Sequence, residues 1–179
     1  MNSSNRGMTR SAKPLVIVVA LIAAVALLAT LAVLYVLGWL PSLTPNRQAQ
    51  IHAAGAQIMP FDLDATTHTF TMTPTGGIQE VTAKDPGDST QIALIQQHLQ
   101  HEAMQFRAGD FSDPASLHGA DMPGLKALEA GAAQVRVEYA TLPAGARLIY
   151  TTDDPQLITA VHQWFGAQLS DHGHDAMSK

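Results

Sequence analysis

An unbroken apolar segment, residues 15–40, constrains this chain more than any other feature of its sequence. The segment carries no charged residue, and Pro41 ends it. At about 1.5 Å per residue, a helix of this length can cross the roughly 30 Å hydrocarbon core of a bilayer. We therefore predict a single transmembrane helix over residues 15–40. A cleaved signal peptide is the alternative, but its apolar region would run for only about 7–15 residues.

Charge is distributed unevenly about this segment. Arg6, Arg10 and Lys13 precede it without any acid, whereas all fifteen Asp and Glu residues and all eight His residues follow it. The positive-inside rule then predicts a cytoplasmic tail over 1–14 and places the rest of the chain outside the cytoplasm. Residues 41–60 show no long periodic pattern and are expected to be a tether, so the folded domain is expected over 61–179.

The composition of residues 61–179 excludes several classes of function. Six Lys and Arg residues stand against fifteen Asp and Glu residues, a net charge of −9, which argues against a nucleic-acid partner. Without cysteine there can be neither a disulfide nor a thiol nucleophile. Phosphate-binding, dinucleotide-binding and Gly-x-Ser-x-Gly motifs are also missing, so we do not expect an enzyme.

Two similar runs of secondary structure are expected in the domain. Alternation of apolar residues with threonine at 66–73, a turn at 74–77 and a return at 78–83 predict a β-hairpin, and a helix capped by Asp88 or Ser89 follows to about 107. After a loop-rich insert with a short helix at 125–130, strands near 135–139 and 147–151 form a second hairpin, and Asp153 or Asp154 caps the last helix. The expected fold class is α+β, with two hairpins, two main helices and a possible duplication of a ββα unit.

Histidine and methionine, without cysteine, are the chemically notable residues outside the predicted membrane segment. Imidazole with thioether suits copper, and imidazole with carboxylate suits zinc. No single spacing is diagnostic of a metal site. The candidate ligands are His118, Met122, His68, His162, His172, His98 and His101.

Each candidate also has a structural interpretation. His98 and His101 could be a solvated pair on one helix, His68 a core-edge histidine of a strand, and His162 a packing residue beside Trp164. His118 and Met122 lie in a loop rich in Pro and Gly, where the histidine could simply fix the backbone. The segment 171–177, which holds His172, could be a mobile tail.

Several segments beyond Phe61 carry a family resemblance, among them 64–70, 109–114, 118–125 and 162–173. They resemble a group of small proteobacterial, membrane-anchored proteins that often bear the name aspartate carbamoyltransferase. That name implies a much longer two-domain α/β enzyme with a Ser-Thr-Arg-Thr loop for carbamoyl phosphate, and this sequence contains no such loop. The resemblance therefore implies a bacterial inner-membrane protein with a periplasmic domain, and carbamoyltransferase activity is not expected.

Two functions are open at this point. The first is a membrane-anchored periplasmic protein that binds a transition metal, copper by preference or zinc, through His and Met. The second is an accessory or structural subunit of an inner-membrane respiratory, photosynthetic or transport complex. Convergence of His118 with His68, His162 or His172 would favour the first.

Overall fold

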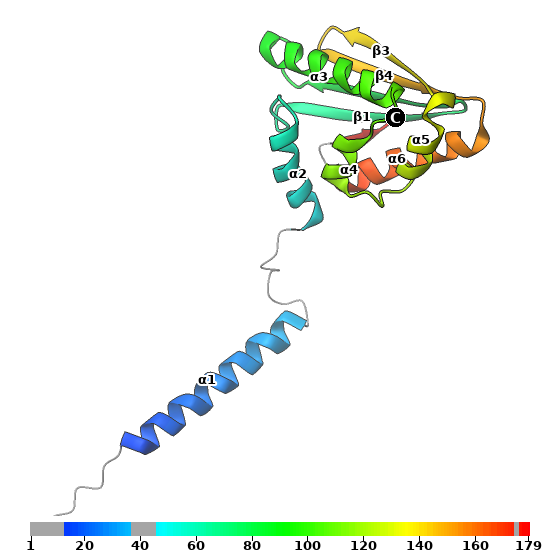
Figure 1. Ribbon diagram of the computed structural model, residues 1–179. Helices are drawn as coiled ribbons and strands as arrows, with labels where there is room; N and C mark the ends of the chain where they lie inside the picture. Colours follow the sequence, from blue (N-terminus) through cyan, green and yellow to red (C-terminus); the bar gives the residue numbers. More distant parts are fainter. Residues whose placement is uncertain (1–12, 37–45, 174–175) are drawn as a thin grey trace, which may run out of the picture. The chain divides into compact units, whose positions relative to one another are not determined.

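The computed structural model describes residues 13–36, 46–173 and 176–179, in two compact units, Met1–Thr44 and Pro45–Lys179 (Figure 1). Helix α1 (Lys13–Val36) is the described part of the first unit, and side chains are described in it only at 17, 21–30 and 33. Within the described residues, no helix combines the length and the apolarity that a membrane crossing needs. Most of the predicted cytoplasmic tail and residues 37–45 lie outside the described residues, so the membrane anchor stays a prediction.

The second unit is an α+β domain built on a five-stranded sheet, in agreement with the predicted fold class. Strands β1 (Thr66–Thr73) and β2 (Gly76–Ala83) form the first hairpin, and β3 (Arg136–Leu142) and β4 (Gly145–Thr151) form the second. The strand order is β3-β4-β2-β1-β5, in which β2 and β4 pair antiparallel at the centre and β5 (Ala176–Ser178) pairs parallel with β1. The remaining elements are α2 (Arg47–Ile58), α3 (Ser89–Arg107), α4 (Ser112–His118), α5 (Leu125–Gly131), a 3₁₀ turn (Ala132–Gln134) and α6 (Pro155–His172).

The core lies between one face of the sheet and the two long helices. Alternate residues of the strands point to this face, so that Phe70 of β1 and Tyr150 of β4 both meet Phe165 of α6, at ring-centre distances of 5.0 and 5.7 Å. Tyr150 also contacts Phe106 of α3 and Trp164 of α6. Because one tyrosine meets both helices, α3 and α6 must cover the same face of the sheet.

Each hairpin is followed by a helix that packs mainly on the other hairpin. Helix α3 follows β1 and β2 but lies mainly against β3 and β4, whereas α6 follows β3 and β4 but lies against β2, β1 and β5. The arrangement fits the predicted pair of ββα units, related across the β2–β4 pairing. Each helix finds most of its packing surface on the other hairpin, so the two halves depend on each other for a core.

Two segments differ from the sequence-based expectation. Part of the expected tether forms helix α2, whose Asn46 side chain accepts a hydrogen bond from Ala49 N and whose Ile51 is buried against the domain. The expected mobile tail instead begins as the last turn of α6, which carries Asp171 and His172, and ends as strand β5. His174 and Asp175 lie outside the described residues.

Candidate functional site

Four of the predicted ligands line one cavity, which has a volume of ≈ 30 Å³. His68 reaches it from β1, His98 from α3, His118 from the end of α4, and His172 from the end of α6. A cavity of this size has room for a water molecule or a metal ion. The other polar residues of its lining are Gln79, Glu102, Asp113 and Gln168, and Met59 adds a thioether.

Three of these imidazoles are in ring contact, and we call them the histidine cluster: His68, His118 and His172. The ring centres of His172 and His68 are 5.2 Å apart, and those of His172 and His118 are 5.1 Å apart. His172 thus connects two histidines that are 50 residues apart in the sequence. The chain has folded so that imidazoles from a strand and two helices meet below its surface.

Local backbone geometry explains how two of the three are placed. His118 is the last residue of α4 and His172 the last of α6, and a glycine with positive φ follows each: Gly119 at 96° and Gly173 at 58°. Such a backbone conformation suits glycine and ends the helix there. The sequence pair His-Gly therefore fixes each imidazole at a helix end, where the side chain can turn toward the cavity.

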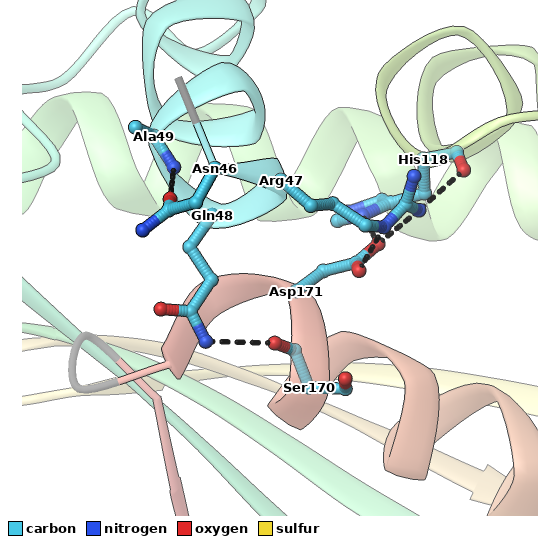
Figure 2. A network of polar contacts seen from close by, with 7 residues as sticks. All are labelled: Asn46, Arg47, Gln48, Ala49, His118, Ser170 and Asp171. Atoms are coloured by element: carbon cyan, nitrogen blue, oxygen red, sulfur yellow. Dashed lines mark hydrogen bonds and ion pairs between the residues drawn. The ribbon is translucent and has the colours of Figure 1, made fainter. Parts of the chain in front are cut away.

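Asp171 holds His118 in one orientation. The Nδ1 atom of His118 lies 2.8 Å from Oδ2 of Asp171, and both side chains are buried, at 2% and 6% exposure. Arg47 of α2 donates to the same carboxylate through Nε (2.5 Å) and Nη2 (2.6 Å), and its Nη2 also donates to the backbone oxygen of His118 at 2.9 Å (Figure 2). The carboxylate fixes the ring, and the guanidinium fixes the carboxylate.

Burial governs the protonation of the cluster. It lowers the pKa of His68 to about 3, with help from the nearby His172, His98 and His118. It also lowers the pKa of His118, although the hydrogen bond with Asp171 acts in the opposite direction. His68 is therefore a neutral imidazole beside an open volume, which is the form that binds metals.

Asp171 is ionised. Burial alone would raise its pKa, but the hydrogen bonds from Arg47 and His118 more than compensate, so that the pKa of this carboxyl is lowered. The site thus combines neutral imidazoles with a fixed negative charge behind one of them.

His98 also lines the cavity, where its partner is a carboxylate of its own helix. Its Nε2 lies 3.5 Å from Oε1 of Glu102, one helical turn further along α3. Burial acts to lower the pKa of His98, but Glu102, assisted by Asp113, outweighs it and leaves this pKa raised. His98 and Glu102 therefore pair with each other at the cavity wall, and the ring of His98 is not one of the three rings in contact in the histidine cluster.

The remaining predicted ligands lie elsewhere. His162 binds the turn between β1 and β2, with Nε2 at 3.0 Å from Thr73 O and 2.9 Å from Gly76 O. Met122 is buried in the hydrophobic core, and His101 is exposed on α3. None of these three lines the cavity, so the structure does not bring them together with the four histidines there.

The ligating atoms of the cluster do not yet surround a common point. Across residues 13–36, 46–173 and 176–179, no three His, Asp or Glu side chains stand in position to hold a metal ion. The physical reason is visible in the pair of rings from His68 and His172, which are nearly parallel, with 8° between their planes. Unless parallel rings are also coplanar, no single point lies in both planes, so both rings cannot direct a nitrogen at one ion.

Sequence reasoning did not identify Arg47 or Asp171 as part of the site. The spacing of four residues between His98 and Glu102 is the sequence signal of a pair on one helix face. The two His-Gly helix ends were a second usable signal. Nothing local marks Arg47, which is 124 residues from the carboxylate that it binds.

Comparison of the chain with protein-family models, curated proteins and solved structures found no match.

Proposed function

We propose that residues 45–179 form a metal-binding domain that takes a divalent transition metal through His68, His118 and His172. The observation that carries this proposal is the contact of the three imidazoles, at 5.2 and 5.1 Å, in a buried cavity. Two imidazoles bound to one tetrahedral ion, with metal–nitrogen bonds of about 2.1 Å, have ring centres about 5 Å apart. The backbone therefore already spaces the rings as a shared ion would.

The hydrogen bond of His118 supports the same function. A ligating imidazole usually donates its second ring N–H to a carboxylate, which selects the tautomer and orients the ring. The carboxylate of Asp171 accepts a hydrogen bond from Nδ1 of His118 in this way. Nε2 is therefore the nitrogen of His118 that would bind the ion. The carboxylate also supplies negative charge behind the ligand, as do Glu102 and Asp113 in the cavity wall.

Binding requires one ring to turn, and His172 is the least buried of the three. It is half-buried, whereas His68 and His118 are buried, and it stands at the last position of α6, next to Gly173. A rotation of its side chain would break the parallel stacking on His68 and direct one of its nitrogens to the ion. The free cavity provides the space for this change.

The donor atoms favour Zn²⁺ or Cu²⁺. Three imidazoles with carboxylates nearby are a nitrogen and oxygen set, which suits both ions, and Cu²⁺ generally binds such a set more tightly. The sulfur donor expected from the sequence, Met122, is in the core, and Met59 is the thioether that lines the cavity. The case for copper over zinc therefore rests on this general order of affinity and on the thioether of Met59.

The apolar segment 15–40 supports a location for this function. A membrane anchor preceded by basic residues would hold the domain at the outer face of the inner membrane, in the periplasm. Metal binding by imidazoles rather than thiolates is consistent with that compartment, where cysteines tend to be oxidised.

Titration of the metal-stripped, full-length chain in detergent with Zn²⁺ and with Cu²⁺ tests the proposal. The expected result is a single bound ion per chain, with at least about a tenfold loss of affinity in His172→Ala and in His118→Ala. His101→Ala is the matched control, because this histidine is exposed on α3 outside the cavity. Its affinity should equal that of the unaltered chain.

Equal affinities in His172→Ala, His101→Ala and the unaltered chain would contradict the proposal. The accessory-subunit role would then be the better hypothesis. Gentle extraction followed by crosslinking would test that role, and a chain recovered only as a monomer would count against it.

A further inference from the structure

Helix α2 holds together the two helix ends that carry His118 and His172. Arg47, its first residue, binds the Asp171 carboxylate and the backbone oxygen of His118 at the same time. The next residue, Gln48, donates from Nε2 to Ser170 O at 3.1 Å. Figure 2 shows these contacts reaching from α2 to the ends of α4 and α6. One helix therefore touches both segments that would supply ligands.

Packing keeps α2 in this place. Ile51 is buried, at 5% exposure, and α2 packs against both α4 and α6. The backbone of Gly55 comes so close to Leu63 that an added Cβ would lie 2.9 Å from its Cδ1 atom, and Leu117 of α4 is the next neighbour. These contacts place Arg47 rigidly, although 60% of its own side chain is exposed.

A short series of side-chain contacts connects Arg47 to the cavity. Arg47 holds Asp171, Asp171 holds Nδ1 of His118, and His118 faces His172 across the cavity. Without the guanidinium, the carboxylate would lose two charge-assisted hydrogen bonds, and His118 would lose the partner that fixes its orientation. A change at Arg47 must therefore reach the proposed ligands even though Arg47 would not touch the ion.

We infer that Arg47 is a positioning residue for the metal site and that docking of α2 is coupled to metal binding. This inference rests on the proposed function. Because coupling is reciprocal, a bound ion strengthens the docking of α2, and release of α2 weakens the hold on the ion. Since Arg47 follows the apolar segment by only seven residues, a force on the chain at the membrane would act first on α2.

The affinity of the full-length chain for Zn²⁺ tests the positioning role, measured with Arg47→Gln, Asp171→Asn and the double variant. We expect Arg47→Gln to weaken binding by about 10-fold, within the range for partners behind a ligand. The same substitution should have a much smaller effect once Asp171→Asn is present, because two of the three hydrogen bonds of Arg47 go to that carboxylate. A purely structural role in packing α2 would instead add to the effect of Asp171→Asn.

Arg136→Gln is the matched control for the loss of an exposed arginine. Its guanidinium pairs with Glu138 at 2.6 Å, is 72% exposed and lies on β3, outside the cavity. This variant should bind Zn²⁺ as the unaltered chain does.

Hydrogen exchange of residues 47–58 tests the coupling itself. Zn²⁺ should slow exchange of these amides in the unaltered chain and in Arg136→Gln, and much less in Arg47→Gln. If the unaltered chain binds Zn²⁺ through His172 but Arg47→Gln binds equally well, the coupling is refuted and the metal function stands. If the unaltered chain does not bind Zn²⁺ or Cu²⁺ at all, both fall.

Discussion

The imidazole of His68 makes the stability of the metal-free protein depend on pH. Its pKa of about 3 in the folded chain lies far below the value of about 6.5 for an exposed histidine. As the pH falls below about 6.5, the unfolded chain gains a proton that the folded chain refuses. The contribution of His68 to the stability of the folded state is therefore fully present above pH 6.5 and is lost progressively as the pH falls toward 3.

Urea unfolding of the metal-free chain between pH 7.5 and pH 5 measures this effect. We expect the unfolding free energy to fall below pH 6.5 with a contribution from His68 of up to about 1.4 kcal/mol per pH unit. His68→Leu removes this proton site and should show a shallower slope, with a smaller slope remaining from His118. Parallel slopes in the two proteins would mean that His68 is protonated in the fold.

Gly77 is a position at which the close approach of two elements leaves no room for a side chain. An added Cβ would lie 2.4 Å from Cε2 of the buried Phe165. Gly77→Ala should therefore destabilise the domain by about 1–3 kcal/mol in urea unfolding, since overpacking forces the ring to move. Gly166→Ala, on the same helix as Phe165 but facing open space, should be neutral or stabilising. Equal effects of the two substitutions would contradict the packing described for α6.

At the scale of elements, the structure shows which of two neighbouring residues caps each long helix, a choice that the sequence left open. Asp88 caps α3 by accepting from Gln91 N at 3.0 Å, and Asp154 caps α6 by accepting from Gln156 N at 2.7 Å. Asp154→Ala should cost about 0.5–2 kcal/mol of stability, whereas Asp153→Ala should change it by less than about 0.5 kcal/mol. Thermal unfolding of the two variants checks the assignment, and the reverse order of effects would place the cap at Asp153.

The same scale shows what the sequence could reveal. The two hairpins and two long helices were predictable because alternation and helical periodicity are local signals, as at Val135, Val137 and Tyr139. Helix α2 was missed because its small Ala and Gly residues form no apolar stripe, and it is stabilised by packing against distant segments. Strand β5 is three residues long and exists through its pairing with His68–Phe70.

The histidine cluster was predictable as residue types but not as an arrangement. His68, His98, His118 and His172 were all candidates, yet the sequence could not separate them from His101 and His162. Which imidazoles meet depends on the parallel pairing of β5 with β1 and on the ends of α4 and α6. These are tertiary contacts that leave no local pattern.

For the whole molecule, the structure sets the domain boundary near Pro45 rather than Phe61. A fragment over 45–179 should unfold in one transition, and a fragment over 61–179 should be less stable by several kcal/mol because it loses the buried Ile51 and the Arg47–Asp171 pair. Urea unfolding of the two fragments, followed by tryptophan fluorescence, measures the difference. Equal midpoints would restore the tether interpretation of residues 45–60.

The placement of each long helix on the other hairpin has a consequence for how the chain is made. When residues 61–107 have left the ribosome, α3 has only part of its packing surface, β2, since β3 and β4 follow some 30 residues later. The first hairpin waits longer still, until α6 arrives near the C-terminus. Long-range contacts of this kind delay folding until the chain is complete. The nascent domain should therefore remain loose during synthesis, which is the state that a chain needs in order to be threaded through a membrane.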